Sequence, residues 1–569
     1  MLHIPDNKLK ERLVKDGVVT AKVFDAALED AKRMGQRPAD ILISKNLITI
    51  EYYTGLVAGF YEVESANLSV RQVDEKVARI LPENIAREKR VVVFNKRKDG
   101  SFDVAMEDPS NLQTVEYLTK YLKAKVNSYL ASREDLNRGF SFYSRQSTKD
   151  FKKVIEENIA VSLRSRVSGA KEAAKELPIV AIVDNILAYA ISSRASDIHI
   201  EILTDGILIR YRIDGILHEI IRVPKEVHPA IVARIKLLAG LKLDEHNKPQ
   251  DGRFRHKVGK DIMDIRVAIM PTFYGEKVEM RLLSATERPQ SLEELGLLKD
   301  HVALIRKNIK KTFGMILVTG PTGSGKTTTL YSVMSILNRP EVNIVTIEDP
   351  IEYDMKYINQ TQINPAAGIT FASGLREIVR QDPNIIMVGE IRDQETAQIA
   401  VQAALTGHLV LSSLHTNDAP TAVPRLLDLG LPPFLVAAVM NMMAAQRLVR
   451  RICSDCIVSY KPDAVILEAL KKQLADLGLD AHIALPATLY KGTGCPACGK
   501  TGYRGRVGIF EILSVSEKIR KLIVNPKFTL GALRVAAKEE GMASMFEDGL
   551  RKVERGMTTV EEVLRVIRE

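Results

Sequence analysis

The stretch that decides the fold class runs from Met315 to Leu337 and reads MILVTGPTGSGKTTTLYSVMSIL. An apolar strand pattern precedes a glycine-rich turn that matches G-x-x-x-x-G-K-[ST], and a helical pattern follows the turn. Backbone N–H groups of such a turn, at the N-terminus of a helix, can hold phosphates. This segment therefore predicts a site for a nucleoside triphosphate, formed by Gly320, Pro321, Thr322, Gly323, Ser324, Gly325, Lys326 and Thr327.

Two side chains of this turn have distinct expected roles. Lys326 would reach the β- and γ-phosphates, and the Thr327 hydroxyl would hold Mg²⁺. A flexible loop that matches the pattern by chance is the alternative, but the strand and helix patterns on either side argue against it. We therefore expect ATP and Mg²⁺ as ligands.

Apolar strand patterns alternate with helical patterns after about residue 290. They read VNIVTIE, NIIMVGE and HLVLSSLH, and such strands between helices predict a parallel sheet covered on both faces. A phosphate-binding loop needs an acid at the end of a neighbouring strand. Glu390 ends one pattern, and the cluster that starts with Glu348 ends another. Ligands bind at the carboxyl ends of parallel strands, so a catalytic role is favoured over a capping or ion-paired one.

Three longer stretches, in this order, resemble the secretion ATPase superfamily, whose members energise type II secretion and type IV pili. They read IVTIEDPIEY, IVRQDPNIIMVGEIRDQETA and GHLVLSSLHTNDA, and the resemblance extends over about residues 177 to 569. It implies that Glu390 is the catalytic or metal-handling acid and that Glu348 is a catalytic acid of the family's Asp box. It also implies that His408 and His415 belong to the His box, where His415 can sense the γ-phosphate. Asn384 stands where the family usually has Asp.

Two arginines lie on one face of the strand pattern LIRYRID, because strand side chains alternate. Taken alone, Arg210 and Arg212 fit a solvated face. The resemblance implies instead that they reach the nucleotide from the domain that precedes the phosphate-binding loop. Arg253, Arg266 and Arg281 are weaker candidates of the same kind.

All four cysteines form two C-x-x-C pairs, Cys453 with Cys456 and Cys495 with Cys498. Two such pairs can supply four thiolates to a tetrahedral Zn²⁺. The 38 residues between the pairs exceed the commonest spacing, so we expect a helical insert that bulges out. Redox pairs are the alternative, but neither pair opens a helix after a strand. Structural zinc is favoured, and the resemblance agrees, because pilus-extension and type II secretion ATPases have this module and pilus-retraction ATPases lack it.

Composition and pattern divide the chain into domains, and the expected fold class is α/β. Near the N-terminus, KLKERLVKDGVV from Lys8 and RPADILISKNLI from Arg37 repeat at an offset of 29 residues. The expected parts are a mainly helical module (1–145), a linker (146–176), a small α+β, PAS-like domain (177–290), a RecA-like ATPase core (291–450), a zinc module (451–510) and a helical tail (511–569).

The N-terminal repeat resembles the tandem module that precedes many pilus-assembly ATPases and that in some of them binds cyclic di-GMP. That module opens each copy with Arg-Leu-Gly and closes it with glutamine. Here the openings are Lys8-Leu9-Lys10 and Arg37-Pro38-Ala39, and Ala31 stands at the first glutamine position. We therefore expect this region to dock a partner rather than to bind cyclic di-GMP.

Composition limits the function further. The 569 residues carry a net charge of +10, with 5% aromatic residues and no tryptophan. There is no basic run interleaved with aromatics, so a DNA translocase or helicase is disfavoured and no nucleic-acid partner is expected. The N-terminus is charged from Asp6 onward, and no run is apolar enough for a membrane span. We therefore expect a cytoplasmic protein that reaches the inner membrane only through partners.

The sequence thus predicts a P-loop ATPase, and the resemblance implies that it works as a homo-hexamer. By the resemblance, it powers type IV pilus assembly through an inner-membrane platform protein, at the cytoplasmic face of that membrane. Type II secretion is the alternative, since both systems share these motifs. A nucleotide-gated scaffold without turnover is a third reading, which the intact acids disfavour.

Overall fold

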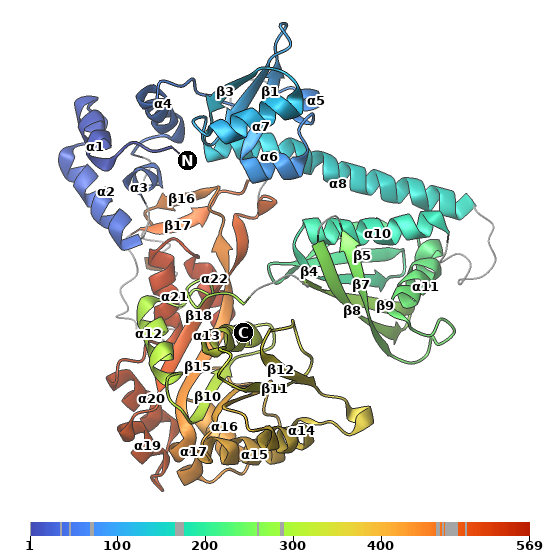
Figure 1. Ribbon diagram of the computed structural model, residues 1–569, viewed down its shortest axis with the longest axis vertical. Coiled ribbons are helices and arrows are strands. Elements are labelled where there is room, and N and C mark those ends of the chain that lie inside the picture. Colours follow the sequence, from blue (N-terminus) through green and yellow to red (C-terminus); the bar gives the residue numbers. More distant parts are fainter. Residues whose placement is uncertain are drawn as a thin grey trace. The chain divides into compact units, whose positions relative to one another are not determined.

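The computed structural model describes residues 2–34, 37–44, 47–68, 73–164, 176–258, 261–284, 289–462, 467–468, 471–472, 488–495 and 498–568. The chain forms two compact units. The first comprises Met1–Thr286 with Cys453–Tyr460 and Lys491–Arg504, and the second comprises Glu287–Ile452 with Lys461–Tyr490 and Gly505–Glu569. Figure 1 shows the ribbon and labels many of the helices and strands of both units.

The first unit opens with two helix pairs that repeat the same local structure. One pair is α1 (Asp6–Lys15) and α2 (Ala21–Met34), and the other is α3 (Pro38–Ser44) and α4 (Ile50–Phe60). The Thr20 hydroxyl accepts a hydrogen bond from the backbone N–H of Val23, and 29 residues later Thr49 accepts one from Tyr52. The sequence repeat is therefore also a repeat of helix caps.

A second part of this unit mixes helices with a small sheet. Its elements are α5 (Glu75–Ala78), α6 (Glu83–Lys89), β1 (Val91–Lys96), β2 (Phe102–Met106), α7 (Leu112–Leu122), β3 (Val126–Leu130) and the long helix α8 (Arg133–Arg164). Strand β2 lies in the middle of the sheet, antiparallel to β1 and parallel to β3. The expected boundary at residue 145 falls inside α8. The N-terminal region is less purely helical than expected, because the buried side chains of β1 and β2 form a core under α7 and α8.

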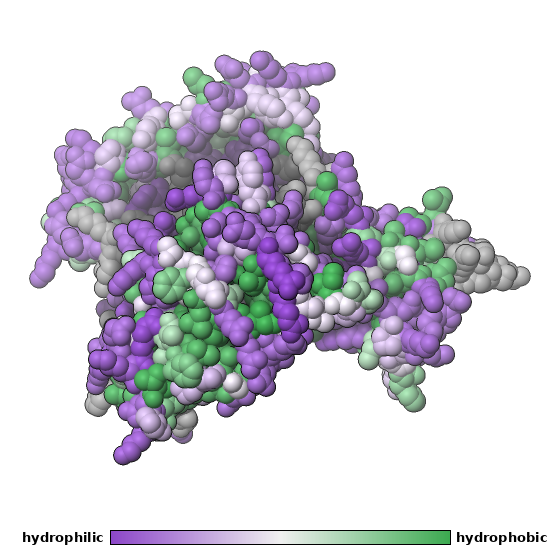
Figure 2. Space-filling view, turned by 60° about the horizontal axis from the view of Figure 1, so that its bottom comes forward, coloured by the Kyte–Doolittle hydropathy of each residue, from purple (hydrophilic) through white to green (hydrophobic). Residues whose placement is uncertain are grey.

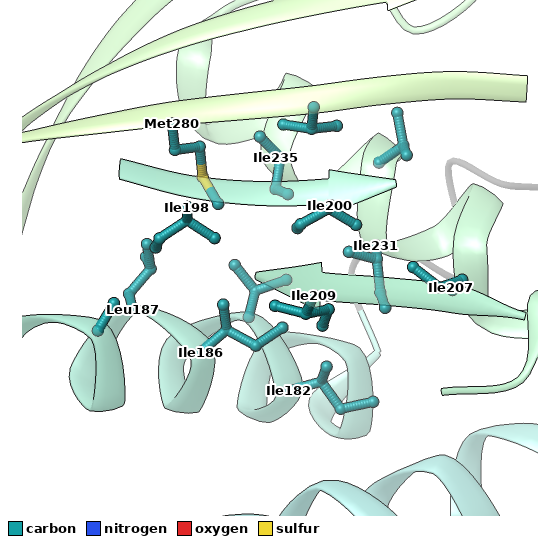
Figure 3. Close-up of a cluster of buried hydrophobic side chains, with 14 of the residues drawn as sticks. Ile182, Ile186, Leu187, Ile198, Ile200, Ile207, Ile209, Ile231, Ile235 and Met280 are labelled. Atoms are coloured by element: carbon teal, nitrogen blue, oxygen red, sulfur yellow. The ribbon is translucent and has the colours of Figure 1, made fainter. Parts of the chain in front are cut away.

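The third part is a six-stranded antiparallel sheet. Helix α10 (Leu177–Ser192) precedes it, and η1 (Lys225–Val227) and α11 (His228–Ala239) lie between its strands in sequence. The strands are β4 (Ala195–Ile202), β5 (Ile207–Ile213), β6 (Ile216–Val223), β7 (Gln250–Val258), β8 (Asp261–Thr272) and β9 (Gly275–Ser284), in the order β6-β5-β4-β9-β8-β7. Figure 3 shows isoleucines of α10 and α11 facing those of β4 and β5. Because strand side chains alternate, the polar residues of these strands lie on the opposite face.

The second unit is built on a seven-stranded sheet in the order β12-β11-β13-β14-β10-β15-β18. Up to its sixth strand, its elements are α12 (Lys299–Asn308), β10 (Gly314–Thr319), α13 (Lys326–Leu337), β11 (Ile344–Glu348), β12 (Ile358–Gln362), η2 (Pro365–Ala367), α14 (Phe371–Ile378), η3 (Val379–Gln381), β13 (Ile385–Val388), α15 (Gln394–Leu405), β14 (Leu409–Leu414), α16 (Ala422–Asp428), α17 (Pro433–Val439) and β15 (Met440–Ile452). The pairings from β12 to β15 are parallel. Every residue of β10, β11, β13 and β14 is buried, which explains their nearly continuous apolar patterns.

The last strand of this sheet, β18 (Tyr503–Ser514), comes from beyond the cysteines. The expected boundaries at residues 450 and 510 therefore fall inside β15 and β18, because the core receives its edge strand only after the cysteine-containing segment. That segment carries the two-stranded pair β16 (Ile457–Tyr460) and β17 (Leu489–Gly492). The expected helical insert between the cysteine pairs lies mostly outside the described residues.

Four helices follow β18, namely α19 (Glu517–Ile523), α20 (Leu530–Glu539), α21 (Met545–Glu554) and α22 (Val560–Arg568). The buried carboxylate of Glu562 in α22 pairs with Arg450 of β15 at 2.5 Å and with Arg565 at 3.0 Å. This pairing anchors the C-terminal helix to the core sheet.

One end of the second unit exposes hydrophobic side chains. Figure 2 brings the end that carries α15, α16 and α17 forward and shows hydrophobic residues gathered among hydrophilic ones. Three large hydrophobic side chains of this unit are exposed, namely Phe313 just before β10, Leu405 at the end of α15 and Phe434 near the start of α17. In the part of the chain that the structure describes, no helix combines the length and the apolar character needed to cross a membrane.

Candidate functional site

The glycine-rich turn connects the carboxyl end of β10 to the N-terminus of α13. At two positions of this turn only glycine fits, because the backbone has a positive φ and no room is left for a Cβ atom. Gly320 has a φ of 148° and Gly325 a φ of 88°. A Cβ on Gly320 would lie 2.5 Å from the backbone oxygen of Gln446, and one on Gly325 would lie 2.8 Å from the side chain of the same residue. The turn is therefore packed closely against β15, while Thr322 and Gly323 remain exposed.

Lys326 is the first residue of α13 and is buried. Its ammonium group donates to the backbone oxygens of Gly320 at 2.8 Å and of Pro321 at 3.0 Å. Burial lowers the pKa of Lys326, and the charge of Glu390 acts in the opposite direction. Thr327, the next residue, is exposed. A cation and a hydroxyl ligand for Mg²⁺ thus stand side by side at the N-terminus of the helix, which fits a bound triphosphate.

Glu390 follows β13 and lies at the same edge of the sheet, because the carboxyl ends of parallel strands meet there. Its carboxylate forms an ion pair with Arg392 and lies 3.2 Å from Nε2 of His415, which follows β14. The Glu390 side chain is 12% exposed, so it is held by its neighbours and only a small part of it reaches solvent. The structure therefore brings the loop lysine, the acid and one histidine together.

Glu348 ends β11 at this edge, but its carboxylate points into the protein and the residue is only 2% exposed. It accepts hydrogen bonds from the hydroxyls of Tyr331 and Thr346 and from the Gln360 amide. Burial raises its pKa, and these three hydrogen bonds oppose that effect. The position differs from the open crevice that we expected, because Tyr331 of α13 and Gln360 of β12 enclose the carboxylate. The exposed acid at this strand end is the next residue, Asp349.

The two histidines that the resemblance assigns to a His box, His408 and His415, lie at opposite ends of β14. His415 follows the strand beside Glu390, whereas His408 precedes it, with Nδ1 2.8 Å from the backbone oxygen of Ala403. A strand rises about 3.3 Å per residue, so the Cα atoms of the two histidines lie roughly 20 Å apart along the strand. His408 is therefore not part of the cluster around Glu390.

Asn384, the departure from the family pattern, lies just before β13. Its side-chain oxygen accepts a hydrogen bond from the backbone N–H of Asn343 at 2.8 Å. An aspartate could accept the same bond, so this substitution leaves the local structure intact.

Arg210 and Arg212 belong to the first unit and lie on the polar face of β5. Arg210 donates to Glu201 at 2.7 Å. Arg212 lies 3.5 Å from Asp197 and donates to the backbone oxygen of Gly215 at 3.0 Å. Both arginines are thus fixed by groups of their own sheet, and both side chains remain partly exposed.

The four cysteine sulfur atoms lie within 4.8 Å of one another. Three separations are 3.8 Å (Cys453 to Cys495), 3.9 Å (Cys456 to Cys498) and 3.7 Å (Cys495 to Cys498). A tetrahedral zinc site with Zn–S bonds of about 2.3 Å has S···S edges of ~3.8 Å, so the cluster fits Zn²⁺. These separations are far too long for disulfides, whose sulfurs lie about 2.05 Å apart. Backbone N–H groups of Cys495 and Gly502 lie 3.1 and 3.3 Å from Sγ of Cys498 and can stabilise a thiolate.

Sequence reasoning missed Arg392 and Tyr331, although both lie inside the stretches that carry the motifs. Arg392 follows Glu390 by two residues, so its opposite charge was a usable signal. Tyr331 contacts Glu348 only because α13 crosses the end of β11, and no local pattern encodes that packing.

Comparison with known families and proteins agrees with this geometry. The type II/IV secretion system protein family matches residues 172–565, which include the antiparallel sheet, the phosphate-binding turn and the cysteines. The MshEN domain family matches residues 61–149, which include the three-stranded sheet. The helix-cap repeat before residue 60 lies outside that second match.

Relatives resemble the chain over most of its length. The type IV pilus assembly ATPase PilB of Myxococcus xanthus is 40% identical over 571 residues and 98% of each chain. PilB of Thermus thermophilus is 39% identical over 94% of this chain and 59% of its own length. The type II secretion system protein E of Pseudomonas aeruginosa is 46% identical over 69% of this chain and 76% of its own length. The solved structure of the Yersinia pseudotuberculosis ATPase DotB covers 68% of this chain and 93% of its own, with 21% identity and a TM-score of 0.50, which supports a shared fold.

Proposed function

Because the chain belongs to the type II/IV secretion system protein family and is an ATPase, we propose that it is the motor of type IV pilus assembly. The observation that carries the proposal is the match to a type IV pilus assembly ATPase over 98% of both chains, since it includes the N-terminal parts as well as the core. Type II secretion is the second candidate, because the ATPase part is 46% identical to a type II secretion protein.

In the proposed reaction, the turn from Gly320 to Gly325 and the N-terminus of α13 hold the phosphates. Lys326 exchanges its two backbone acceptors for oxygens of the β- and γ-phosphates, so its charge keeps a partner. The Thr327 hydroxyl would hold Mg²⁺, whose charge supplies stabilisation of the phosphate oxygens. Glu390 orients the attacking water and accepts its proton, while His415 and Arg392 fix the carboxylate.

Three further residues complete the proposed machinery. From its buried position, Glu348 supports the turn that follows β11 and carries the exposed Asp349. Arg210 and Arg212 add positive charge at the phosphates of their own or a neighbouring chain. An arginine in that role is worth about 10³-fold or more in phosphoryl transfer.

The proposal extends to metal and partners. We propose that Cys453, Cys456, Cys495 and Cys498 hold one structural Zn²⁺. The motor would act as a homo-hexamer at the cytoplasmic face of the inner membrane and move a platform protein embedded there. The N-terminal repeat would dock a protein partner, and cyclic di-GMP and nucleic acid are not among the proposed ligands.

Two variants separate ATP binding from turnover. Lys326→Ala should weaken ATP binding about tenfold or more, because a buried phosphate loses its cation. Glu390→Gln should keep ATP affinity and lower kcat by about 10² to 10⁴-fold, because the amide cannot accept a proton. Nucleotide titration and phosphate release measure the two effects. Wild-type turnover by Glu390→Gln would show that this acid is misassigned.

The cellular role is tested with the same variant. In a strain that lacks the native gene, wild-type protein should restore surface pili and Glu390→Gln should not. Restored protein secretion without any change in pili would favour the second candidate.

A further inference from the structure

The hydroxyl of Tyr331 joins three segments behind the catalytic edge. It donates to Oε2 of Glu348 at the end of β11. It accepts hydrogen bonds from the backbone N–H of Glu352 at 3.2 Å and from the Gln360 amide of β12 at 3.3 Å. The ring is fully buried, and the ring of Tyr353 packs edge-on against it with centroids 4.6 Å apart. One phenol oxygen therefore ties α13 to a strand end, to the turn after it and to the next strand.

The Tyr331 hydroxyl lies between two parts of the proposed nucleotide site, the phosphate-binding helix α13 and the acidic turn after β11. Tyr331 is one helical turn beyond Thr327 and shares its face of α13, the helix that starts at the phosphates. On the other side, its partners Glu348 and Glu352 flank the turn that carries the exposed Asp349.

The acidic turn at residues 349–352 is also linked to the catalytic acid, Glu390. The charge of Asp349 acts on Arg392, and Arg392 forms an ion pair with Glu390. Hydrogen bonds thus run from the phosphate-binding helix through the phenol to both sides of the acidic turn, and the charge of Asp349 acts on the arginine that pairs with Glu390.

We propose that Tyr331 is a positioning residue for ATP hydrolysis, which holds the acidic turn at residues 349–352 in register with the helix that carries the nucleotide. The proposal rests on ATP hydrolysis at this site, and it is independent of the choice between pilus assembly and secretion. Thr346 also donates to Glu348, at 2.5 Å, but it does so from β11 itself and cannot tie the turn to α13. Thr346 therefore offers a matched comparison.

The experiment compares Tyr331→Phe with Thr346→Val. Each removes one buried hydroxyl donor from the same carboxylate and keeps most of the side-chain volume. Tyr331→Phe should lower kcat by about 10- to 100-fold, because small misplacements of catalytic groups slow the chemical step by such factors. It should leave the Kd for Mg·ATP within about twofold of the wild-type value. Thr346→Val should leave kcat within about threefold of wild type. Tyr357 is an exposed tyrosine just before β12. Tyr357→Phe therefore serves as a control for the loss of a tyrosine hydroxyl elsewhere in this segment.

Thermal unfolding of all three variants measures any general loss of stability. Three results would overturn the proposal: a kcat for Tyr331→Phe within twofold of wild type, an equal fall in Thr346→Val, or a loss of ATP affinity that accounts for the slower turnover. Wild-type protein without any ATP hydrolysis would instead contradict the proposed function.

A measurement on the wild-type protein keeps the proposal testable if Tyr331→Phe does not fold. The backbone N–H of Glu352 donates to Tyr331, so its hydrogen exchange should slow when Mg·ADP orders the start of α13. Unchanged exchange at this amide on nucleotide binding would overturn the proposal.

Discussion

At the scale of single residues, the end of a strand predicts where an acid lies but not which way it faces. Glu390 and Glu348 both end apolar strand patterns, and both lie at the expected edge of the sheet. The carboxylate of Glu390 keeps a small exposed surface, whereas Tyr331 and Gln360 enclose that of Glu348. These enclosing residues come from other elements, so only the packing of a helix and a strand across β11 determines the burial.

Glu562 gives a residue-scale prediction with a definite pH dependence. Burial raises its pKa, but hydrogen bonds from Arg450 and Arg565 outweigh burial and lower the pKa to about 2. The pKa of a glutamate in the unfolded chain is about 4.3. Because the folded pKa is the lower one, the stabilisation is present above about pH 5 and is lost as the pH falls through 4 toward 2.

Glu562→Gln should therefore lower the free energy of unfolding by roughly 3 kcal/mol at pH 7 and by less than half of that at pH 3. Urea denaturation at both pH values measures the difference. Glu561→Gln, its exposed neighbour, should have little effect at either pH. An equal effect of Glu562→Gln at both pH values would show that the ion pairs are not the cause.

At the scale of elements, local patterns predict strands but not the sheet that each strand joins. Strands β10, β11, β13 and β14 follow from their apolar patterns, because every residue in them is buried. Strand β18 lies beyond the cysteines, where the sequence predicts the zinc module and the tail, yet it completes the seven-stranded sheet. Such pairing depends on contacts between distant parts of the chain, which periodicity does not carry.

The cysteine cluster ties the ends of two strands of that sheet. Cys453 directly follows β15, and its backbone N–H donates to the oxygen of Gly502, just before β18, at 2.9 Å. A metal at the four sulfurs would hold the point where the chain leaves the sheet close to the point where it returns.

Purified protein should accordingly contain about one Zn²⁺ per chain. Cys495→Ser should lose this metal and should be cleaved faster by protease around residues 453–510, because one ligand of four is missing. Ser454→Ala, between the first two cysteines, should keep the zinc. Elemental analysis and limited proteolysis measure both effects, and a zinc content near zero in the wild type would contradict the prediction.

At the scale of the whole molecule, the predicted catalytic residues are divided between the two units. The phosphate-binding turn, Glu390 and His415 belong to the second unit, and Arg210 and Arg212 belong to the first. The phosphate-binding turn follows from its own sequence pattern, whereas only the family resemblance implies a role at the nucleotide for His415, Arg210 and Arg212. In the proposed motor, assembly would bring the two groups to one nucleotide, and no local sequence pattern encodes that step.

Arg210→Ala in the full-length chain should lower kcat by about 10³-fold under assembling conditions and leave ATP binding nearly unchanged. Arg222→Ala is the matched control, since Arg222 lies on the neighbouring strand β6 and pairs with Glu219 and Asp205 at the surface. Phosphate release measures turnover. If chains with Arg210→Ala regain turnover when mixed with Glu390→Gln chains, the arginine acts on a neighbour's nucleotide, and an unchanged kcat would make Arg210 structural.

The late position of β18 has a consequence for synthesis on the ribosome. The nucleotide loop is complete once α13 has emerged, but the sheet beneath it has no last strand until residue 514 leaves the tunnel. Until then β15 is an open edge, which can pair with other nascent chains. A transcript or message cut within the cysteine segment therefore yields a chain with every nucleotide-binding residue and no finished ATPase. The order of elements thus makes the last strand of the sheet, and not the nucleotide loop, the step that completes the core sheet during synthesis.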